Sequence, residues 1–206
     1  MSGSENNAPV VYILHGDAGV RTLLGQMLEH AGQAARAFAC VDAFVRKDCP
    51  SRNTCMILDP QLDGCGLAVQ ERLAERGMQP PLIFMGHREQ VQVPTAVRAM
   101  KAGAIDFLTW PLTGDELMPS VARALSVDLR QRERDEAQAS VQQRFDALTR
   151  RETQIFTLVV TGLMNKQMAD RLSLSEASIK IHRGNVMRKM GARTLVDLVH
   201  MHGLLS

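Results

Sequence analysis

Apolar and polar residues alternate along residues 1–125 in a way that predicts strands connected by helices. Short apolar runs bounded by turn residues predict strands at Val10–Leu14, Ala34–Phe38, Cys55–Leu58, Leu82–Met85 and Asp106–Thr109. Apolar residues at helical spacing predict helices at Ala18–Ala31, Val41–Arg46, Leu67–Arg76 and Thr95–Ala102, and a fifth from about Asp115. This alternation predicts an α/β domain whose parallel sheet is covered by helices on both faces.

The fifth helix is expected to continue into a long polar segment. Thr113 and Glu116 have the spacing of a capping box, and Pro119 is expected to delay or kink the first turns. Residues 126–146 lack Gly and Pro and are rich in good helix formers, which indicates a helical linker. A coiled coil between two protomers is the alternative, but Arg130–Ser140 has no apolar seam to support it.

From Thr149 onward the pattern becomes entirely helical. Thr149 and Glu152 form a capping box that begins a helix, and Gly162 ends it. Further helices are predicted at Asn165–Leu172, from Ser175 to about Met190, and at Leu195–His202. The chain is therefore expected to consist of a first domain (1–125), a linker (126–146) and a second domain (147–206).

The net charge of +2 in 206 residues conceals a difference between the two ends of the chain. Residues 149–206 hold nine Lys and Arg against four Asp and Glu, whereas residues 1–148 hold fifteen against eighteen. The excess of positive charge predicts that the C-terminal part meets a polyanion. The apolar share of 45% argues against a disordered chain.

The sequence predicts a cytoplasmic location. No apolar run is long enough to span a membrane, and the N-terminus lacks the pattern of a secretion signal. The cysteines lack paired CxxC spacing, so we expect reduced thiols rather than disulfides or a zinc site; they are Cys40, Cys49, Cys55 and Cys65.

The third C-terminal helix has positive charge only. From Ile179 to Met190 it carries four Lys and Arg residues and no acid, beside a buried stripe of apolar residues. A surface helix that meets only solvent usually mixes both signs of charge. The helix is therefore predicted to enter the major groove of DNA, and a plain basic solvated face is the alternative.

The segment from Leu148 to Thr194 resembles a LuxR-type helix-turn-helix along its whole length. The resemblance is carried by LTRRE at its start, GLMNK before the second helix, MADRLSLS through the turn and IKIH in the third helix. It implies an all-α four-helix LuxR-type helix-turn-helix domain that binds double-stranded DNA sequence-specifically as a dimer.

The resemblance also implies which residues would contact DNA. Lys180 and Arg183 would face the groove, and Ile181 would contact a thymine methyl. Phosphate or positioning contacts would come from Asn165, Lys166, Ser178, His182, Arg188 and Lys189. Gly184 offers no side chain where the family often has a polar one, which gives Arg183 or Asn185 more weight. The dimerisation face would be Leu195, Leu198, Val199 and His202, part of which has internal packing as its alternative.

The first domain resembles a response-regulator receiver of the NarL/FixJ kind. The resemblance is carried by AVRAMKAGAIDFLTWPL (Ala96–Leu112) and by Leu58 and Asp59 at the end of the third predicted strand. It implies a flavodoxin-like (βα)5 fold. The loop after Asp59 is shorter than usual, and the segment between Met85 and Thr95 is a few residues longer.

Receivers of this family accept a phosphoryl group on one aspartate, which here would be Asp59. Two carboxylates after the first strand bind Mg²⁺ together with that aspartate, and a hydroxyl and a lysine hold the phosphoryl oxygens. In this sequence those four positions are, in the same order, His15, Gly16, Met85 and Trp110. Neutral imidazole is a poor Mg²⁺ ligand and glycine offers none. Asp17 is a nearby carboxylate that could turn inward.

The sequence therefore predicts a receiver that works without Mg²⁺-dependent phosphorylation. We expect Met85 and Trp110 to fill the phosphoryl site and to hold the domain in one state. A small-molecule or redox input around His15, Asp59 and Cys65 is the alternative. No third soft ligand accompanies His15 and Cys65, so no metal or other cofactor is expected.

These features together predict a transcription regulator without enzymatic activity. Its partners would be promoter or operator DNA, a second copy of the chain and, as a further candidate, RNA polymerase. One rival is a conventional regulator whose Asp59 is phosphorylated by a histidine kinase. Another is an interaction module whose receiver docks a different regulator and whose DNA binding is secondary.

Overall fold

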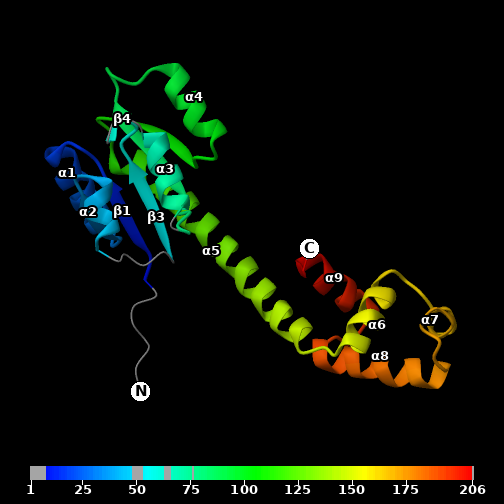
Figure 1. Ribbon diagram of the computed structural model, residues 1–206. Coiled ribbons are helices and arrows are strands. Elements are labelled where there is room, and N and C mark those ends of the chain that lie inside the picture. The colour runs from blue at the N-terminus through cyan, green and yellow to red at the C-terminus, as the bar shows by residue number, and fades with distance from the viewer. Residues whose placement is uncertain (1–7, 48–52, 63–65, 76, 206) are drawn as a thin grey trace. The chain divides into compact units, whose positions relative to one another are not determined.

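The structure is a computed structural model that describes residues 8–47, 53–62, 66–75 and 77–205. The chain forms two compact units, Met1–Arg132 and Glu133–Ser206 (Figure 1). Three positions used in the sequence analysis lie outside the described residues: Cys49, Cys65 and Arg76.

The first unit contains a five-stranded parallel sheet in the order β2-β1-β3-β4-β5. The strands are β1 (Val10–Leu14), β2 (Ala34–Phe38), β3 (Thr54–Leu58), β4 (Leu82–His87) and β5 (Asp106–Trp110). The predicted flavodoxin-like order is confirmed. β4 continues two residues beyond the prediction because Gly86 and His87 still pair with β5, although their side chains give no apolar signal.

The helices of this unit are α1 (Ala18–His30), α2 (Val41–Val45), α3 (Gly66–Ala74), α4 (Val93–Lys101) and α5 (Gly114–Asp146). α4 begins two residues earlier than predicted, with Pro94 in its first turn, where a missing N–H removes no helical hydrogen bond. α5 begins at Gly114 without the delay expected from Pro119. Its Glu116 carboxylate accepts hydrogen bonds from the backbone N–H of Thr113 at 2.8 Å and from its hydroxyl at 3.1 Å.

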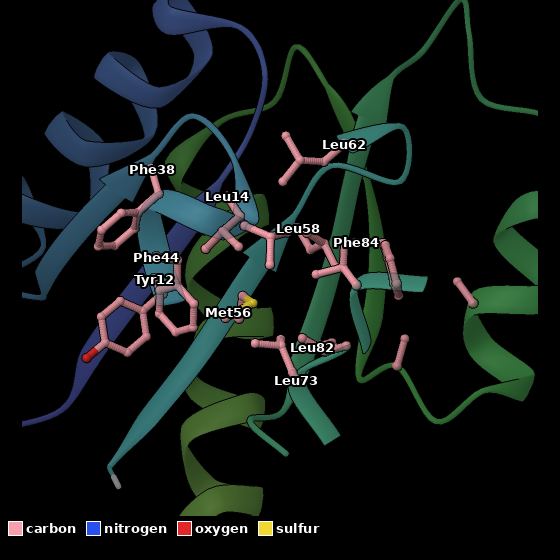
Figure 2. Packing of buried hydrophobic residues seen from close by; sticks show 14 residues of the cluster. Tyr12, Leu14, Phe38, Phe44, Met56, Leu58, Leu62, Leu73, Leu82 and Phe84 are labelled. Atoms are coloured by element: carbon pink, nitrogen blue, oxygen red, sulfur yellow. The ribbon is translucent and has the colours of Figure 1, made fainter. Parts of the chain in front are cut away.

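Two apolar cores lie on opposite faces of the sheet. One packs β-strand residues against α2, α3 and α4, and Figure 2 shows its aromatic part, where the Tyr12 and Phe44 ring centroids are 5.0 Å apart. The other packs alternate strand residues, including Ile13 and Met85, against α1 and α5. Successive side chains of a strand point to opposite faces, so each strand supplies both cores.

The segment predicted as a helical linker is the second part of α5. Asp128 holds α5 against β3, because its carboxylate accepts a hydrogen bond from Thr54 N at 3.3 Å. The same carboxylate accepts a hydrogen bond from Arg132 Nε at 2.9 Å. Arg132 also donates to Asn53 Oδ1 at 3.1 Å. These hydrogen bonds therefore hold α5 against the rest of the first unit as far as Arg132, the last residue of that unit.

The second unit is all-helical and includes the end of α5, where Val141 and Phe145 pack into its core. Its other helices are α6 (Arg150–Val160), α7 (Asn165–Leu172), α8 (Glu176–Met190) and α9 (Leu195–Leu205). The predicted capping box of Thr149 and Glu152 is present. Gly191 ends α8 in the left-handed region at φ 71°, which glycine adopts without strain.

Candidate functional site

Three polar residues meet at the carboxyl end of the sheet in the first unit. His15 follows β1, Asp59 follows β3, and His87 ends β4. His15 Nε2 lies 4.0 Å from Asp59 Oδ2, and the two imidazole rings are 5.9 Å apart in an edge-to-face arrangement. His87 was not among the predicted site residues, because the apolar pattern predicts that β4 ends at Met85; the position of His87 at the same sheet edge as His15 was the available signal.

His15 is buried, with a side chain that is 2% exposed. Its Nδ1 accepts a hydrogen bond from the backbone N–H of Asp17 at 3.1 Å, so the proton of the neutral ring belongs on Nε2. That Nε2 has no hydrogen-bond partner. Burial lowers the pKa of His15, and the Asp59 carboxylate opposes this effect in part. The residue is therefore a neutral neighbour of Asp59 at physiological pH.

The carboxylate of Asp17 caps a helix. Its Oδ1 accepts a hydrogen bond from Val20 N at 3.0 Å at the start of α1, and this bond lowers the pKa of Asp17. The inward turn considered from the sequence is thus replaced by a capping contact. Arg21, which the sequence analysis also missed, donates to the carbonyl oxygens of His15 at 2.7 Å and Gly16 at 2.8 Å.

The residues at this sheet edge do not fit Mg²⁺. The ion needs several hard oxygen ligands, but the side chains near Asp59 are an imidazole at His15 and none at Gly16, while Asp17 is held by α1. Within the described residues, no group of three or more His, Cys, Asp and Glu side chains could hold a metal ion. Asp59 itself accepts hydrogen bonds from Gln61 N at 2.8 Å and Gly16 N at 3.4 Å.

Met85 and Trp110 both belong to the apolar core between the sheet, α1 and α5. Met85 is completely buried there, and Trp110 is half-buried and packs against the same cluster. A thioether and an indole thus stand at positions where the family resemblance implies a hydroxyl and a lysine. Neither side chain supplies the cation or the hydroxyl that would grip a phosphoryl group.

In the second unit, α7 and α8 form a helix-turn-helix. Ser173 joins them in a left-handed conformation at φ 53°, and the Ser175 hydroxyl accepts a hydrogen bond from Ser178 N at 3.1 Å at the start of α8. Ile179 and Val186 of α8 are fully buried against the other helices. The opposite side of α8 is thereby fixed toward solvent.

The outward side of α8 holds part of the predicted DNA-binding set. Lys180, Gly184 and Arg188 are exposed, and Ile181 is 66% exposed, which is unusual for an isoleucine. On α7, Lys166 is exposed as well. These residues form the group that we call the outward face.

The other members of the predicted set on α7 and α8 are less exposed, and one pair of them links the two helices. Arg183 is half-buried and donates from its guanidinium to Asn165 Oδ1 at 3.0 Å. Asn185 accepts a hydrogen bond from Arg188 at 3.1 Å. Ser178 and His182 are half-buried. Arg183 therefore links α7 to α8, a contact that the sequence did not predict, and its groove-facing role stays a prediction.

Lys189 makes contacts inside its own unit that the sequence did not predict. Its ammonium lies 2.7 Å from the Glu152 carboxylate and donates to the carbonyl of Ala147 at 3.1 Å. The Glu152 side chain is 6% exposed, and its bonds with Lys189 and Thr149 lower the pKa of Glu152 to about 2. Lys189 therefore has an internal acidic partner, and its contact with a DNA phosphate stays a prediction.

The predicted dimerisation residues also divide into two groups. Leu198 is fully buried in the core of its own unit, so its assignment to a dimer contact is corrected. Leu195, Val199 and His202 are exposed along one side of α9. Helical spacing brings these three together, and Val196, 74% exposed, lies beside them.

Replacing Gly184 by alanine is expected to stabilise the second unit. A Cβ at this position meets nothing within 4 Å, and the glycine lies inside a helix at a negative φ. Alanine removes the conformational freedom that glycine loses on folding, a gain of about 0.5–1 kcal/mol. Urea unfolding followed by far-ultraviolet circular dichroism measures it, and a loss of stability would contradict the open environment of Gly184.

No helix in the part of the chain that the structure describes is both long and apolar enough to cross a membrane.

Comparison with known proteins identifies both units. Residues 11–122 match the family model of the response regulator receiver domain, and residues 146–202 match that of bacterial regulatory proteins of the luxR family. The chain is 38% identical over 199 residues to nodulation protein W of Bradyrhizobium diazoefficiens, covering 96% of this chain and 86% of that protein. It is 36% identical over 198 residues to the response regulator protein TodT of Pseudomonas putida, covering 95% and 86%.

A solved structure supports the same assignment. The response regulator StyR has a TM-score of 0.81 and 34% identity, with 95% of this chain and 98% of that chain covered. Full-length FixJ from B. japonicum has a TM-score of 0.55 and 28% identity, with 95% and 96% covered. The chain therefore belongs to the NarL/FixJ-type response regulators, the two-component transcription regulators that join a receiver domain to a LuxR-type helix-turn-helix.

Proposed function

We propose that this regulator binds operator DNA sequence-specifically, with α8 in the major groove. The observation that carries the proposal is the outward face, where Lys180 and Arg188 flank an exposed Ile181 and no carboxylate occurs from Ile179 to Met190. Lysine and arginine contact phosphates and guanine edges, and an apolar side chain fits a thymine methyl. Arg183 and Asn165 would set the angle between the two helices on the duplex.

The proposed binding unit is a homodimer that acts in the cytoplasm, where its DNA is found. The exposed apolar residues Leu195, Val196 and Val199 on α9 support pairing of two second units, because such a patch gains stability when it is covered. A dimer would read two half-sites, which raises both affinity and specificity. RNA polymerase is a further proposed partner at the promoter.

The receiver is proposed to act without Mg²⁺-dependent phosphorylation. This part of the proposal is supported by the oxygen-poor surroundings of Asp59 and by the apolar packing of Met85 and Trp110. The family's phosphoryl switch needs a cation and a hydroxyl to hold the new phosphoryl oxygens. A receiver that lacks them would stay in one state or respond to another input.

Incubation with acetyl phosphate and Mg²⁺ is expected to leave the intact mass of the protein unchanged. The Trp110→Lys variant is expected to behave in the same way, because the restored lysine does not supply the missing magnesium carboxylates. A related regulator with the usual acidic residues serves as the positive control. A stoichiometric gain of one phosphoryl group that disappears in Asp59→Asn would refute this part of the proposal.

Conventional phosphorylation of Asp59 by a histidine kinase is the second candidate function. It is favoured by the aspartate itself, which remains 17% exposed at the end of β3 with two backbone N–H donors on its carboxylate. The mass experiment distinguishes directly between a receiver that is phosphorylated on Asp59 and one that is not. DNA binding by the untreated protein supports the first, whereas affinity that is nonspecific and lost in moderate salt would favour a module that mainly docks another regulator.

A further inference from the structure

A cavity of about 310 Å³ lies next to Asp59 in the first unit. The loop after β3, the end of β4 with the loop that follows it, and one side of α4 enclose this cavity. The residues that line the cavity include Asp59, Phe84, His87, Val91, Thr95 and Arg98. Four of the lining residues, His87, Gln90, Val91 and Gln92, belong to the segment between Met85 and Thr95 that is a few residues longer than usual for the family.

Gly86 allows the walls of the cavity to come together. A Cβ on Gly86 would lie 2.7 Å from Val91 Cγ2 and 3.2 Å from Pro60 Cγ, both closer than van der Waals contact. Only glycine therefore lets β4 meet the loop after β3 and the longer loop at this distance. The side chains of Val91 and Pro60 therefore lie close against the backbone of β4 at Gly86, and this contact shapes the cavity.

Asp59 brings an uncompensated negative charge to one wall. Its carboxylate accepts two backbone hydrogen bonds, and the nearest basic side chain is the buried His15, whose Nε2 is 4.0 Å away. Among the described residues no lysine or arginine pairs with it. A partly buried carboxylate without a cation attracts an ammonium or amidinium group from solution.

Arg98 brings a positive charge to the same cavity. It lies on the same side of α4 as Thr95 and Ala99, at helical spacing, and all three line the cavity. Among the described residues, the Arg98 guanidinium forms no ion pair with any carboxylate, Asp59 included. A guanidinium binds a carboxylate through two parallel hydrogen bonds.

We propose that this cavity binds a small zwitterion, a free amino acid or a close derivative, with its ammonium at Asp59 and its carboxylate at Arg98. Phe84, Val91 and Ala99 provide an apolar surface for its carbon atoms, and the Thr95 hydroxyl provides a further polar contact. The cavity volume is at the small end of the range for ligand sites, which suits a ligand of this size. The ligand would act on the receiver at the place where phosphorylation acts in relatives.

Isothermal titration of the untreated full-length protein with each common amino acid, one at a time, tests the proposal. We expect saturable binding of at least one amino acid, with one site per chain. The amide of that amino acid, which lacks the carboxylate, and its N-acetyl form, which lacks the ammonium, are each expected to bind about tenfold more weakly or worse.

Two variants assign each charge to its partner. Arg98→Gln is expected to weaken the amino acid about tenfold but to leave the affinity of the amide unchanged, because the amide has already lost that contact. Asp59→Asn is expected to weaken the amino acid to the same extent and to leave the N-acetyl form unchanged. Arg88→Gln, in the same loop but outside the cavity lining, is the matched control and is expected to bind normally.

The proposal is overturned if no amino acid binds saturably, if the amide binds as tightly as the acid, or if both variants bind like the wild type. Circular dichroism of the variants checks that they are folded. The titration is independent of DNA binding and of the phosphoryl mass experiment, so its failure is distinguishable from failure of the proposed function.

Discussion

Glu152→Ala is expected to lower the free energy of unfolding of the second unit by about 3 kcal/mol. Glu152 has a nearly buried carboxylate that accepts hydrogen bonds from Lys189 Nζ at 2.7 Å and from Thr149 N at 2.8 Å. Its removal leaves the ammonium of Lys189 without its acidic partner and leaves the first turn of α6 without its capping box. The value is at the low end for buried ion pairs because the Lys189 side chain is 30% exposed.

Two spectroscopic signals separate the units in this measurement. The chain has a single tryptophan, Trp110, which lies in the first unit, whereas far-ultraviolet circular dichroism follows the helices of both. We expect the helical transition of the second unit to move to lower urea while the tryptophan transition stays in place. Glu136→Ala, at an exposed position of α5, is the control. A shift no larger than that of the control would contradict the role of Glu152.

The same carboxylate makes this difference depend on pH. The pKa of Glu152 falls from an ordinary value of 4.5 to about 2 in the folded protein, so its stabilising effect is complete above pH 4.5. As pH falls through this interval the unfolded chain takes up the proton first, and the stabilising effect declines. The wild type and Glu152→Ala should therefore converge in stability as the pH approaches 2.

Lys180→Ala is expected to cost about 1–3 kcal/mol of binding free energy on the preferred operator and to relax the preference at one base position. Lys180 is exposed on the outward face, and no protein partner holds its ammonium in the described structure. A lysine that donates to a guanine edge discriminates between base pairs, so its loss affects the cognate sequence most. Selection from a random duplex library defines that sequence, and fluorescence anisotropy measures the affinities.

Lys166→Ala is the matched control for this experiment. Lys166 is an exposed lysine on α7, and as a phosphate contact it should weaken all sequences equally and reduce the salt dependence by about one unit. If Lys180→Ala gives that same uniform loss, Lys180 is a phosphate contact and the base-reading role fails. If both variants bind DNA with the affinity of the wild type, the duplex lies on another surface of the protein.

The sequence predicted the fold well because local patterns and the fold agree. All five strands and all the helices lie where the apolar spacing put them, with ends displaced by a few residues, as at β4 and α4. The displaced ends depend on backbone pairing with a neighbouring strand or on a proline in a first turn. Such contacts leave little trace in the apolar pattern.

The candidate sites were less accessible to prediction. Lys180, Ile181 and Arg188 are exposed as expected, but Lys189, Arg183 and Leu198 make contacts inside their own unit. A sequence shows that a lysine is present on a helix but not which acid on another helix lies next to it. Glu152 and Lys189 are 37 residues apart along the chain, and only the packing of α6 against α8 brings them together.

The sequence by itself determined the two-unit plan, the parallel sheet and the helix-turn-helix, because residue types and their spacing carry this information. The tertiary structure alone decided which charged side chains form ion pairs or hydrogen bonds inside the protein and which remain exposed without such a partner. It placed His87 beside His15, and it brought Arg98 and Asp59 into the lining of one cavity with no ion pair between them. The physical reason is that pairing and burial depend on distances between elements, which local sequence does not encode.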